Sequence, residues 1–275
     1  MEEVQVIVAS ADVRGIALMS VAIGISHAAA AILLSRRTWF ASLSSAKQSM
    51  TAQALVNVAL AGSLCVMYAS ALGTFGISQL LNDAGAADRM FGAPETYANT
   101  LRLNFAMVLY ECFFYVLFGK GLDLWAHHLL GVLILTLTLR SGQCGAYIAW
   151  AGTSEGTTVF LGLRTLMLES GMKKSPLYVA NGLLLWLGFF GLRVVSLFGC
   201  TWRIARDLFV VLPETDAARV DAEAHPLLRH LCLGSAFFIW ALSTWWFYKI
   251  TLGVLDAVGL GKKTTMKSGD GEKQK

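Results

Sequence analysis

Long apolar segments separated by short polar ones run along most of the chain. About seven of them approach the roughly 20 residues that a helix needs to cross a bilayer. Lipid offers backbone groups no hydrogen-bond partner, so these segments are predicted to be helices. The predicted spans are residues 13–34, 54–76, 101–118, 122–139, 146–168, 177–199 and 231–252. The pattern predicts an all-α, polytopic membrane bundle.

Basic residues follow alternate spans, which predicts an orientation. They are Arg36, Arg37 and Lys47 after the first span, Lys120 after the third, Lys173 and Lys174 after the fifth, and five lysines in residues 256–275. Because Lys and Arg near span ends stay cytoplasmic, we expect a lumenal N-terminus and a cytosolic C-terminus. The loop 201–229 carries four arginines on the other side, balanced by five acidic residues, and part of it is predicted as an interfacial helix.

Composition narrows the function classes. The chain is 56% hydrophobic and only 15% charged, with a mean hydropathy of +0.58, which excludes soluble enzymes. The net charge of +4 resides in loops and the tail, so nucleic acid is not an expected partner. The five scattered cysteines are interpreted as core residues. The N-terminus, Met1-Glu2-Glu3, lacks the basic start of a signal peptide, so the first span is expected to be retained.

Ionisable residues inside the predicted spans mark a candidate site. A charge at mid-bilayer costs roughly 2.5–3.5 kcal/mol, so such residues usually face a bundle interior or a wet cavity. The set is Glu111, Asp123, His127, His128, Glu155, Arg164 and Arg193. A structural role, with pairing across the bundle, is the alternative for each of them and the preferred one for Glu111 and Arg193. His27 is expected to be a packing residue.

Helical spacing assigns different roles to these groups. Asp123 and His127 are four residues apart and share a face, while His128 is rotated by one position. We expect Asp123 to orient one imidazole, which could then accept a proton or attack a carbonyl. A polar stripe is also predicted on the fifth span, formed by Glu155, Thr158, Gly162, Thr165 and Glu169. Arg164 points away from it and needs a partner elsewhere.

No metal site is predicted. Membrane di-iron enzymes need about eight histidines in characteristic boxes, and this chain has five histidines in total. A phosphate-binding loop and a serine-nucleophile elbow are also absent from the sequence. A channel or transporter remains a third class of function, although the chain has no internal repeat that would favour one.

Two motifs resemble those of the TLC-domain membrane proteins, a family that includes the ceramide synthases. Asp123-Leu124-Trp125-Ala126-His127-His128 is similar to the family's D-x-x-x-H-H. Residues 155–164, reading EGTTVFLGLR, resemble the E-x-S-T-P-F-x-N-x-R stretch of its smaller members, with Val159 and Gly162 replacing proline and asparagine. The H-D-x-x-D run of ceramide synthases is missing, since residues 152–155 read GTSE. The match therefore favours the smaller members.

The resemblance implies an organisation and a function. Six of the spans would form a barrel around a lipid-accessible cavity, within a TLC domain at 51–255 that follows a segment at 1–50 and precedes a disordered tail at 256–275. His127, His128 and Glu155 would be catalytic, and Glu111, Asp123, Thr158 and Arg164 would bind lipid. Membrane lipids are the expected partners, in the endoplasmic reticulum or, alternatively, the plasma membrane; homo-oligomerisation is left open. The function is lipid handling or, as the alternative, N-acyl transfer from acyl-CoA to a sphingoid base, with no bound cofactor.

Overall fold

The computed structural model describes residues 2–92, 95–118, 121–212 and 227–257. These residues form helices and no strands, which confirms the predicted all-α class. The helices are α1 (Glu2–Ser35), α2 (Thr38–Ala41), α3 (Ser45–Phe75), α4 (Ile77–Leu81), α5 (Ala86–Phe91), α6 (Glu95–Phe118), α7 (Leu122–Ser141), α8 (Gly145–Gly152), η1 (Thr153–Glu155), α9 (Gly156–Glu169), η2 (Met172–Lys174), α10 (Pro176–Gly188), η3 (Phe189–Ser196), α11 (Leu197–Arg206), η4 (Asp207–Val211) and α13 (Leu228–Ala257).

Six helical segments of the described chain are long and apolar enough to cross a membrane. They are Val13–Ser35, Ser45–Phe75, Tyr97–Phe118, Leu122–Ser141, Pro176–Val211 and Leu228–Asp256. Large apolar side chains such as Leu18, Phe113 and Leu187 are exposed on the outside of the bundle, as lipid contact requires. The chain is therefore an integral multi-pass membrane protein.

The predicted fifth span is built differently from the other six. It consists of α8 and α9 joined by the 3₁₀ turn η1, and therefore contains no single long helix. Two hydroxyls capture carbonyls at this point: Thr153 Oγ1 donates to the Trp150 carbonyl at 2.7 Å, and Thr157 Oγ1 to the Ser154 carbonyl at 2.9 Å. Such side-chain bonds compete with the helical ladder and bend helices. Hydropathy reports the length of a span and carries no information about this break.

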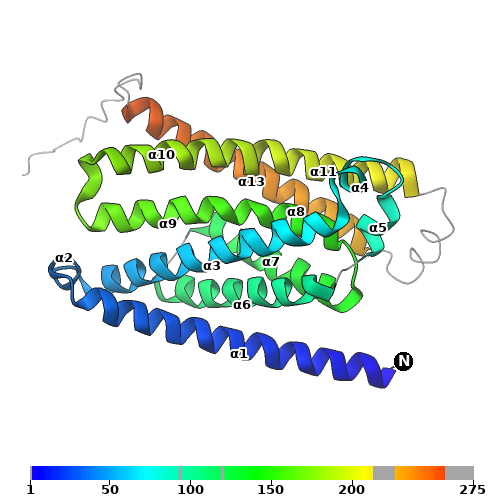
Figure 1. The fold of residues 1–275 in the computed structure, drawn as a ribbon, viewed down its shortest axis with the longest axis horizontal. Coiled ribbons are helices and arrows are strands. Elements are labelled where there is room, and N and C mark those ends of the chain that lie inside the picture. Colours follow the sequence, from blue (N-terminus) through cyan, green and yellow to red (C-terminus); the bar gives the residue numbers. More distant parts are fainter. Residues whose placement is uncertain (1, 93–94, 119–120, 213–226, 258–275) are drawn as a thin grey trace, which may run out of the picture.

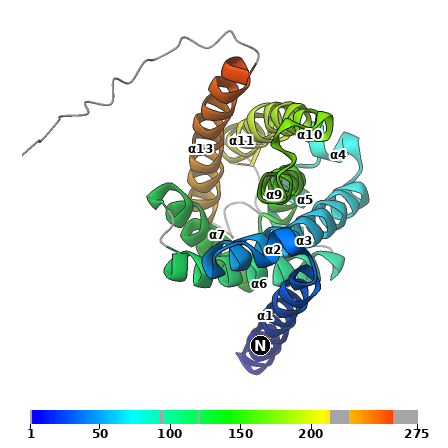
Figure 2. The ribbon, with the colours of Figure 1, turned by 90° about the vertical axis from the view of Figure 1, so that its left-hand side faces the viewer.

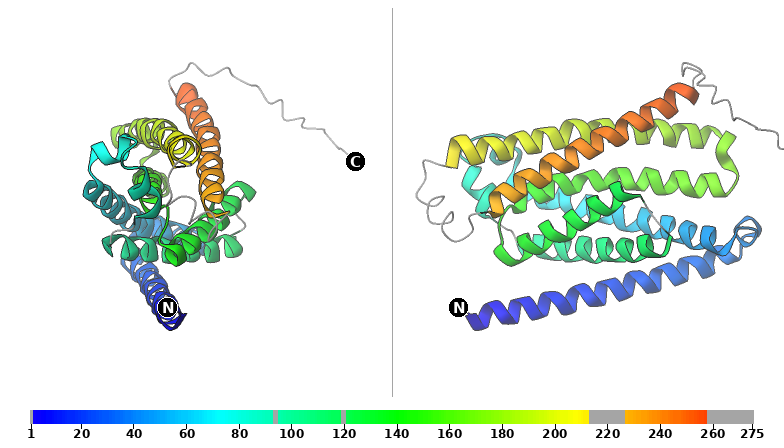
Figure 3. Two further views of the ribbon diagram at one scale, coloured as in Figure 1. Left: turned by 90° about the vertical axis from the view of Figure 1, so that its right-hand side faces the viewer. Right: turned by 180° about the vertical axis from the view of Figure 1, so that it is seen from behind.

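Six segments close into a ring: five of the six candidate spans, without α1, and the segment formed by α8 and α9. Each packs on the next in the order α3, α6, α7, α13, α10–η3 and α9, and α9 returns to α3 (Figure 2). Small residues allow the tightest of these contacts: a Cβ added to Gly162 would lie 2.9 Å from the Ala54 carbonyl oxygen. The helix α1 packs outside the ring against α3 and α6. The view from behind shows α13 crossing its neighbours obliquely (Figure 3).

The segment from Pro176 to Val211 is longer than the predicted sixth span. It begins where Ser175 accepts a hydrogen bond from the backbone N–H of Tyr178, with proline at the first helical position. Two π-helical stretches, η3 and η4, interrupt it. The start of the predicted loop 201–229 is thus part of this span. Residues 213–226, including most of the predicted interfacial helix, lie outside the described residues, as does the predicted tail from residue 258.

The described basic loops lie at one end of the bundle. The connection around α2, the turn η2 and the end of α13 meet there, whereas α4 and α5 lie at the opposite end, with the N-terminus of the chain (Figure 1). We call these the basic end and the far end. Lys120, predicted to lie at the basic end, is outside the described residues. The grouping agrees with the alternation of basic loops expected from the sequence, while the orientation in the membrane remains a prediction.

Candidate functional site

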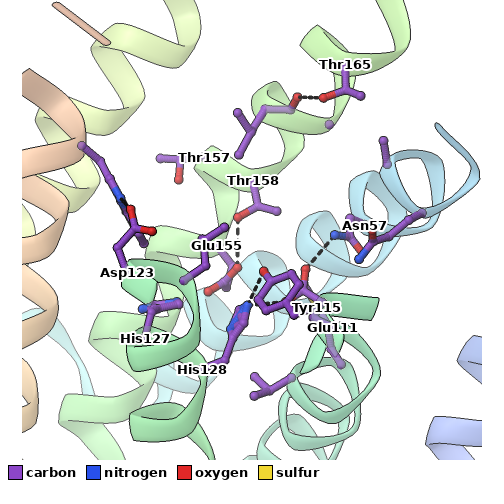
Figure 4. A pocket seen from close by; sticks show the side chains of 18 of the residues that line it. Asn57, Glu111, Tyr115, Asp123, His127, His128, Glu155, Thr157, Thr158 and Thr165 are labelled. Atoms are coloured by element: carbon purple, nitrogen blue, oxygen red, sulfur yellow. Dashed lines mark hydrogen bonds and ion pairs between the residues drawn. The ribbon is translucent and has the colours of Figure 1, made fainter. Parts of the chain in front are cut away.

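A cavity of about 450 Å³ lies inside the ring, nearer the basic end. It is lined by side chains of α3, α6, α7, η1, α9, η3 and α13. Its apolar lining includes Met107, Val108, Leu161, Phe189 and Ile250. Its polar lining residues are Gln53, Asn57, Glu111, Tyr115, Asp123, His127, His128, Glu155, Thr157, Thr158, Thr165, Arg193 and Lys249. Most of the polar groups buried at the basic end therefore meet in one apolar-walled space (Figure 4).

Most of the residues predicted for the site line this cavity. They are His127, His128, Glu155, Glu111, Asp123 and Thr158. Arg164 is not among the lining residues; its guanidinium carbon lies 4.4 Å from the ring centroid of Tyr178 on α10. Arg164 thus has a partner on another helix, as expected, and the structure does not bring it together with the other predicted binding residues. Glu169, the last residue of the predicted stripe, instead pairs with Lys47 at 3.2 Å.

His128 is held in a polar network that spans three helices. Its Nε2 lies 2.6 Å from the Tyr115 hydroxyl and 3.2 Å from Oε2 of Glu111 (Figure 4). Asn57 on α3 donates to the other carboxylate oxygen of Glu111 at 2.7 Å. Both His128 and Glu111 are buried. The network fixes the orientation of this imidazole and connects α3, α6 and α7 at the cavity wall.

His127 has no such network. Neither of its ring nitrogens has a hydrogen-bond partner in the described part of the chain, and its Nδ1 is buried. The ring contacts Trp246 edge-on, with centroids 5.6 Å apart, and lies 5.0 Å from the His128 ring. The two histidines therefore differ in their surroundings, as their one-residue rotation predicts: His128 is held through Nε2 by Tyr115 and Glu111, whereas His127 has no hydrogen-bond partner within the described chain.

The prediction that Asp123 orients a histidine is wrong. Its Oδ2 accepts a hydrogen bond from Nε1 of Trp246 at 2.9 Å and lies 3.6 Å from Nζ of Lys249. The four-residue spacing makes Asp123 and His127 neighbours on one face of α7, which permits a hydrogen bond between them without requiring one. Donors from α13, more than 120 residues away in the chain, bind it instead.

Glu155 and Arg193 form the third polar group of the cavity. Thr158 donates to Oε2 of Glu155 at 3.1 Å, and Nη2 of Arg193 lies 4.0 Å from Oε1 of Glu155. Nε of Arg193 donates to the Thr157 hydroxyl at 2.7 Å. Arg193 pairs with Glu155 across the bundle, as its preferred structural role predicted, and it also lines the cavity. Within the described ranges, no group of three or more His, Cys, Asp and Glu side chains is placed to hold a metal ion.

Several cavity residues were not predicted from the sequence. Asn57, Tyr115 and Thr157 are ordinary residues of membrane helices, and Lys249 and Trp246 lie near a span end, where such residues commonly anchor a helix. Arg193 reaches the cavity from the π-helical stretch η3, which hydropathy does not predict. One pattern in the sequence could have pointed to the site: Gln53 and Asn57 are polar and four residues apart, which places them on one face of α3.

The fold and the cavity define a multi-pass helical membrane protein with titratable groups inside its bundle. A family model described as the TLC domain matches residues 47–252. The chain therefore belongs to the TLC-domain family. Neither the curated proteins nor the solved structures contain a match to it.

Proposed function

We propose that this protein binds membrane amphiphiles in the cavity and handles lipid within the bilayer. The observation that supports the proposal is that buried polar side chains from separate helices line one cavity with apolar walls inside a membrane bundle. The volume of about 450 Å³ falls within the roughly 300–1,000 Å³ of small-molecule sites. A lipid could place its polar group between His127, Glu155 and Arg193 and its first methylene groups against Leu161 and Phe189.

Mass spectrometry of copurifying lipid tests this function. The full chain is purified in mild detergent, beside a His127→Ala/His128→Ala variant. His27→Ala is the matched control, because His27 contacts Tyr110 and Ser49 on the outer side of the ring and does not line the cavity. We expect bound lipid in the wild type and the control, and a changed lipid content in the double variant. Wild-type protein that carries no lipid above the level of an unrelated membrane protein would refute the proposal.

A second candidate function is N-acyl transfer from acyl-CoA to a sphingoid base. It is favoured by His127, whose ring nitrogens have no partner within the described chain and which lies beside the His128–Glu111 pair. In this reaction the amine nitrogen attacks the thioester carbonyl and forms the amide bond while the carbon–sulfur bond breaks. Imidazole takes the proton from the amine, and the departing thiolate of CoA takes up a proton.

Turnover distinguishes the two functions. Purified wild type, His127→Ala and His27→Ala are incubated with acyl-CoA and a sphingoid base, and the amide product is measured. Product from the wild type and the control, but not from His127→Ala, would establish the enzyme. Bound lipid with no product would leave lipid binding as the function.

The expected location is the endoplasmic reticulum with the basic end in the cytosol, and the plasma membrane is the alternative. Imaging of the tagged full chain would distinguish the two membranes. Labelling of single cysteines placed near Lys173 and near Asp83 by an impermeant reagent would test the orientation, since these positions lie at opposite ends of the bundle.

A further inference from the structure

The guanidinium group of Arg193 has unused hydrogen-bonding capacity inside the cavity. Its side chain is only 6% exposed. Nε donates to Thr157, but Nη1 and Nη2 make no hydrogen bond within the described chain, since the nearest carboxylate oxygen lies 4.0 Å away. The ring centroid of Phe189 lies 5.2 Å from the guanidinium carbon. Four N–H bonds on these two terminal nitrogens thus lack an acceptor.

A buried guanidinium group whose N–H bonds have no acceptor destabilises the folded protein. Arginine stays protonated in proteins, and a buried charge that is not hydrogen-bonded opposes folding. Two other buried arginines of the described bundle, Arg89 and Arg203, direct terminal nitrogens at carboxylate and carbonyl oxygens. Arg193 also lies in a π-helical stretch, and π-bulges are frequent at functional sites. Together these features indicate an acceptor oxygen supplied by a ligand.

The charges around Arg193 select the kind of oxygen. Glu155 lies beside the guanidinium group, and Glu111 lines the same cavity. These two carboxylates disfavour a further anion, so they would repel a phosphate or a fatty-acid carboxylate. A neutral carbonyl oxygen accepts from Arg193 without adding charge. The apolar side chains of Leu161 and Phe189 in the same lining suit the carbon chain next to such a carbonyl.

We propose that Arg193 is the carbonyl-binding residue of the cavity and donates hydrogen bonds to the acyl carbonyl of a neutral ester or amide lipid. This inference rests on the proposed lipid-binding function and names the chemical group that the cavity recognises. It assigns Arg193 a positioning role in lipid binding, separate from any role of the histidines.

A matched pair of lipids isolates the carbonyl. A 1-monoacylglycerol and the 1-alkylglycerol of equal chain length differ only in an ester carbonyl, and the free fatty acid adds a carboxylate for comparison. Binding of each to the purified full chain is measured by native mass spectrometry. We expect the wild type to bind the ester about 10- to 100-fold more tightly than the ether, as expected for a hydrogen bond to a charged donor. The fatty acid should bind more weakly than the ester.

Substitutions assign the preference to Arg193. Arg193→Met should reduce the ester-to-ether ratio to about one, whereas the control Arg140→Met, at an exposed position in the last turn of α7 outside the cavity, should leave it unchanged. Equal wild-type affinity for ester and ether would overturn the inference while leaving lipid binding intact, and a preference for the fatty acid would replace it with an anion site. This wild-type comparison decides the matter even where Arg193→Met does not fold. Wild type that carries no lipid at all refutes the proposed function instead.

Discussion

Both ends of the bundle bury arginines beside carboxylates, but the arginines differ in how many hydrogen bonds they make. At the far end, Arg89 and Asp207 are completely buried, and Asp207 accepts from Nε and Nη2 of Arg89 at 2.8 Å each. Tyr147 donates to the same carboxylate, and Nη1 of Arg89 donates to the Gln79 carbonyl. At the cavity, Arg193 has one hydrogen bond and a carboxylate 4.0 Å away.

The far-end network continues to the surface. Nη2 of Arg203 lies 2.8 Å from Asp207 and 2.9 Å from Asp83, and Arg206 contacts both oxygens of Asp83. The network therefore joins α4, α5, α8, α11 and η4, which meet at this end (Figure 3). Arg89, Tyr147 and Asp207 satisfy one another, and of the buried arginine donors here only Nε of Arg203 has no partner within the described chain, so the network closes the bundle with little unused capacity.

The comparison shows why burial of charge alone does not identify a functional site. A network whose charged groups bind one another stabilises the fold, whereas a group at a cavity wall that leaves most of its hydrogen-bonding capacity unused has that capacity to offer a ligand. This distinction depends on the number of hydrogen bonds each group makes rather than on residue type. Substitutions at the two ends should therefore separate stability from binding.

The largest effect is expected for Asp207→Ala. The substitution leaves Arg89 buried without its carboxylate, a change that costs about 3–5 kcal/mol in buried ion pairs. We expect most of the protein to be lost on expression and any remainder to unfold at a much lower temperature in detergent. The control is Arg89→Met/Asp207→Leu, which removes both charges and should recover part of the stability. A melting temperature unchanged in Asp207→Ala would show that the network does not hold the far end together.

The next effect should distinguish the two histidines. His128→Ala removes the partner of Tyr115 and Glu111 and should lower the free energy of unfolding by about 1–3 kcal/mol. His127→Ala, which breaks no hydrogen bond with the described chain, should cost less stability and act mainly on lipid content. Thermal unfolding and lipid mass spectrometry on the same samples check both effects. Equal loss of stability in the two variants would contradict the distinction.

The sequence predicted the fold better than the site. Apolar length gave the traversing segments, because about 20 apolar residues have few alternatives to spanning a bilayer. It could not give the turn at Thr153–Glu155 or the π-helical stretch at Phe189–Ser196, since these depend on hydroxyl–carbonyl bonds and on packing against neighbouring helices. The short helices α4 and α5 lie between two predicted spans, in a stretch where no helix was predicted.

The partners of individual side chains were the least predictable. Periodicity placed Asp123 and His127 on one face of a helix, but Trp246 and Lys249 from the last helix determine where the carboxylate binds. Arg193 was recognised as an intramembrane charge and pairs with Glu155 across the bundle, as its preferred structural role predicted, but its place on the cavity wall was not predicted. Residue type indicated the chemistry available to the cavity, and only the packing of the ring determined which groups remain open.

A smaller effect is expected where the cavity approaches the surface. Asp123 and Lys249 have 37% and 48% exposed side chains, so their ion pair should contribute only about 0–1 kcal/mol. Lys249→Met should barely change the melting temperature, but it loosens the contact between α7 and α13 beside the cavity. We expect faster exchange of bound lipid, measured with labelled lipid in detergent, and the exposed Lys173→Met is the control. Unchanged exchange would show that lipid does not pass this pair.

The smallest effect should lie at the outer edge of the far-end network. Hydrogen bonds from Arg206 and then Arg203 hold the pKa of Asp83 below its ordinary value. Because the folded-state pKa is depressed, the stabilisation from Asp83 is complete above the unfolded-state pKa of about 3.9 and is lost as the pH falls toward the folded-state value. Asp83→Asn should therefore lower the melting temperature slightly at pH 7 and remove part of its decline below about pH 4.

The matched control for Asp83 is Asp88→Asn in the same region. Melting curves of the wild type and both variants between pH 3 and pH 7 give the comparison. The Asp83→Asn curve should approach the wild-type curve as the pH falls, because protonation removes from the wild type the same charge that the substitution removes. A gap that stays constant across this range would mean that Asp83 acts through its shape rather than its charge. The outer ion pairs would then contribute nothing electrostatic to the closed end.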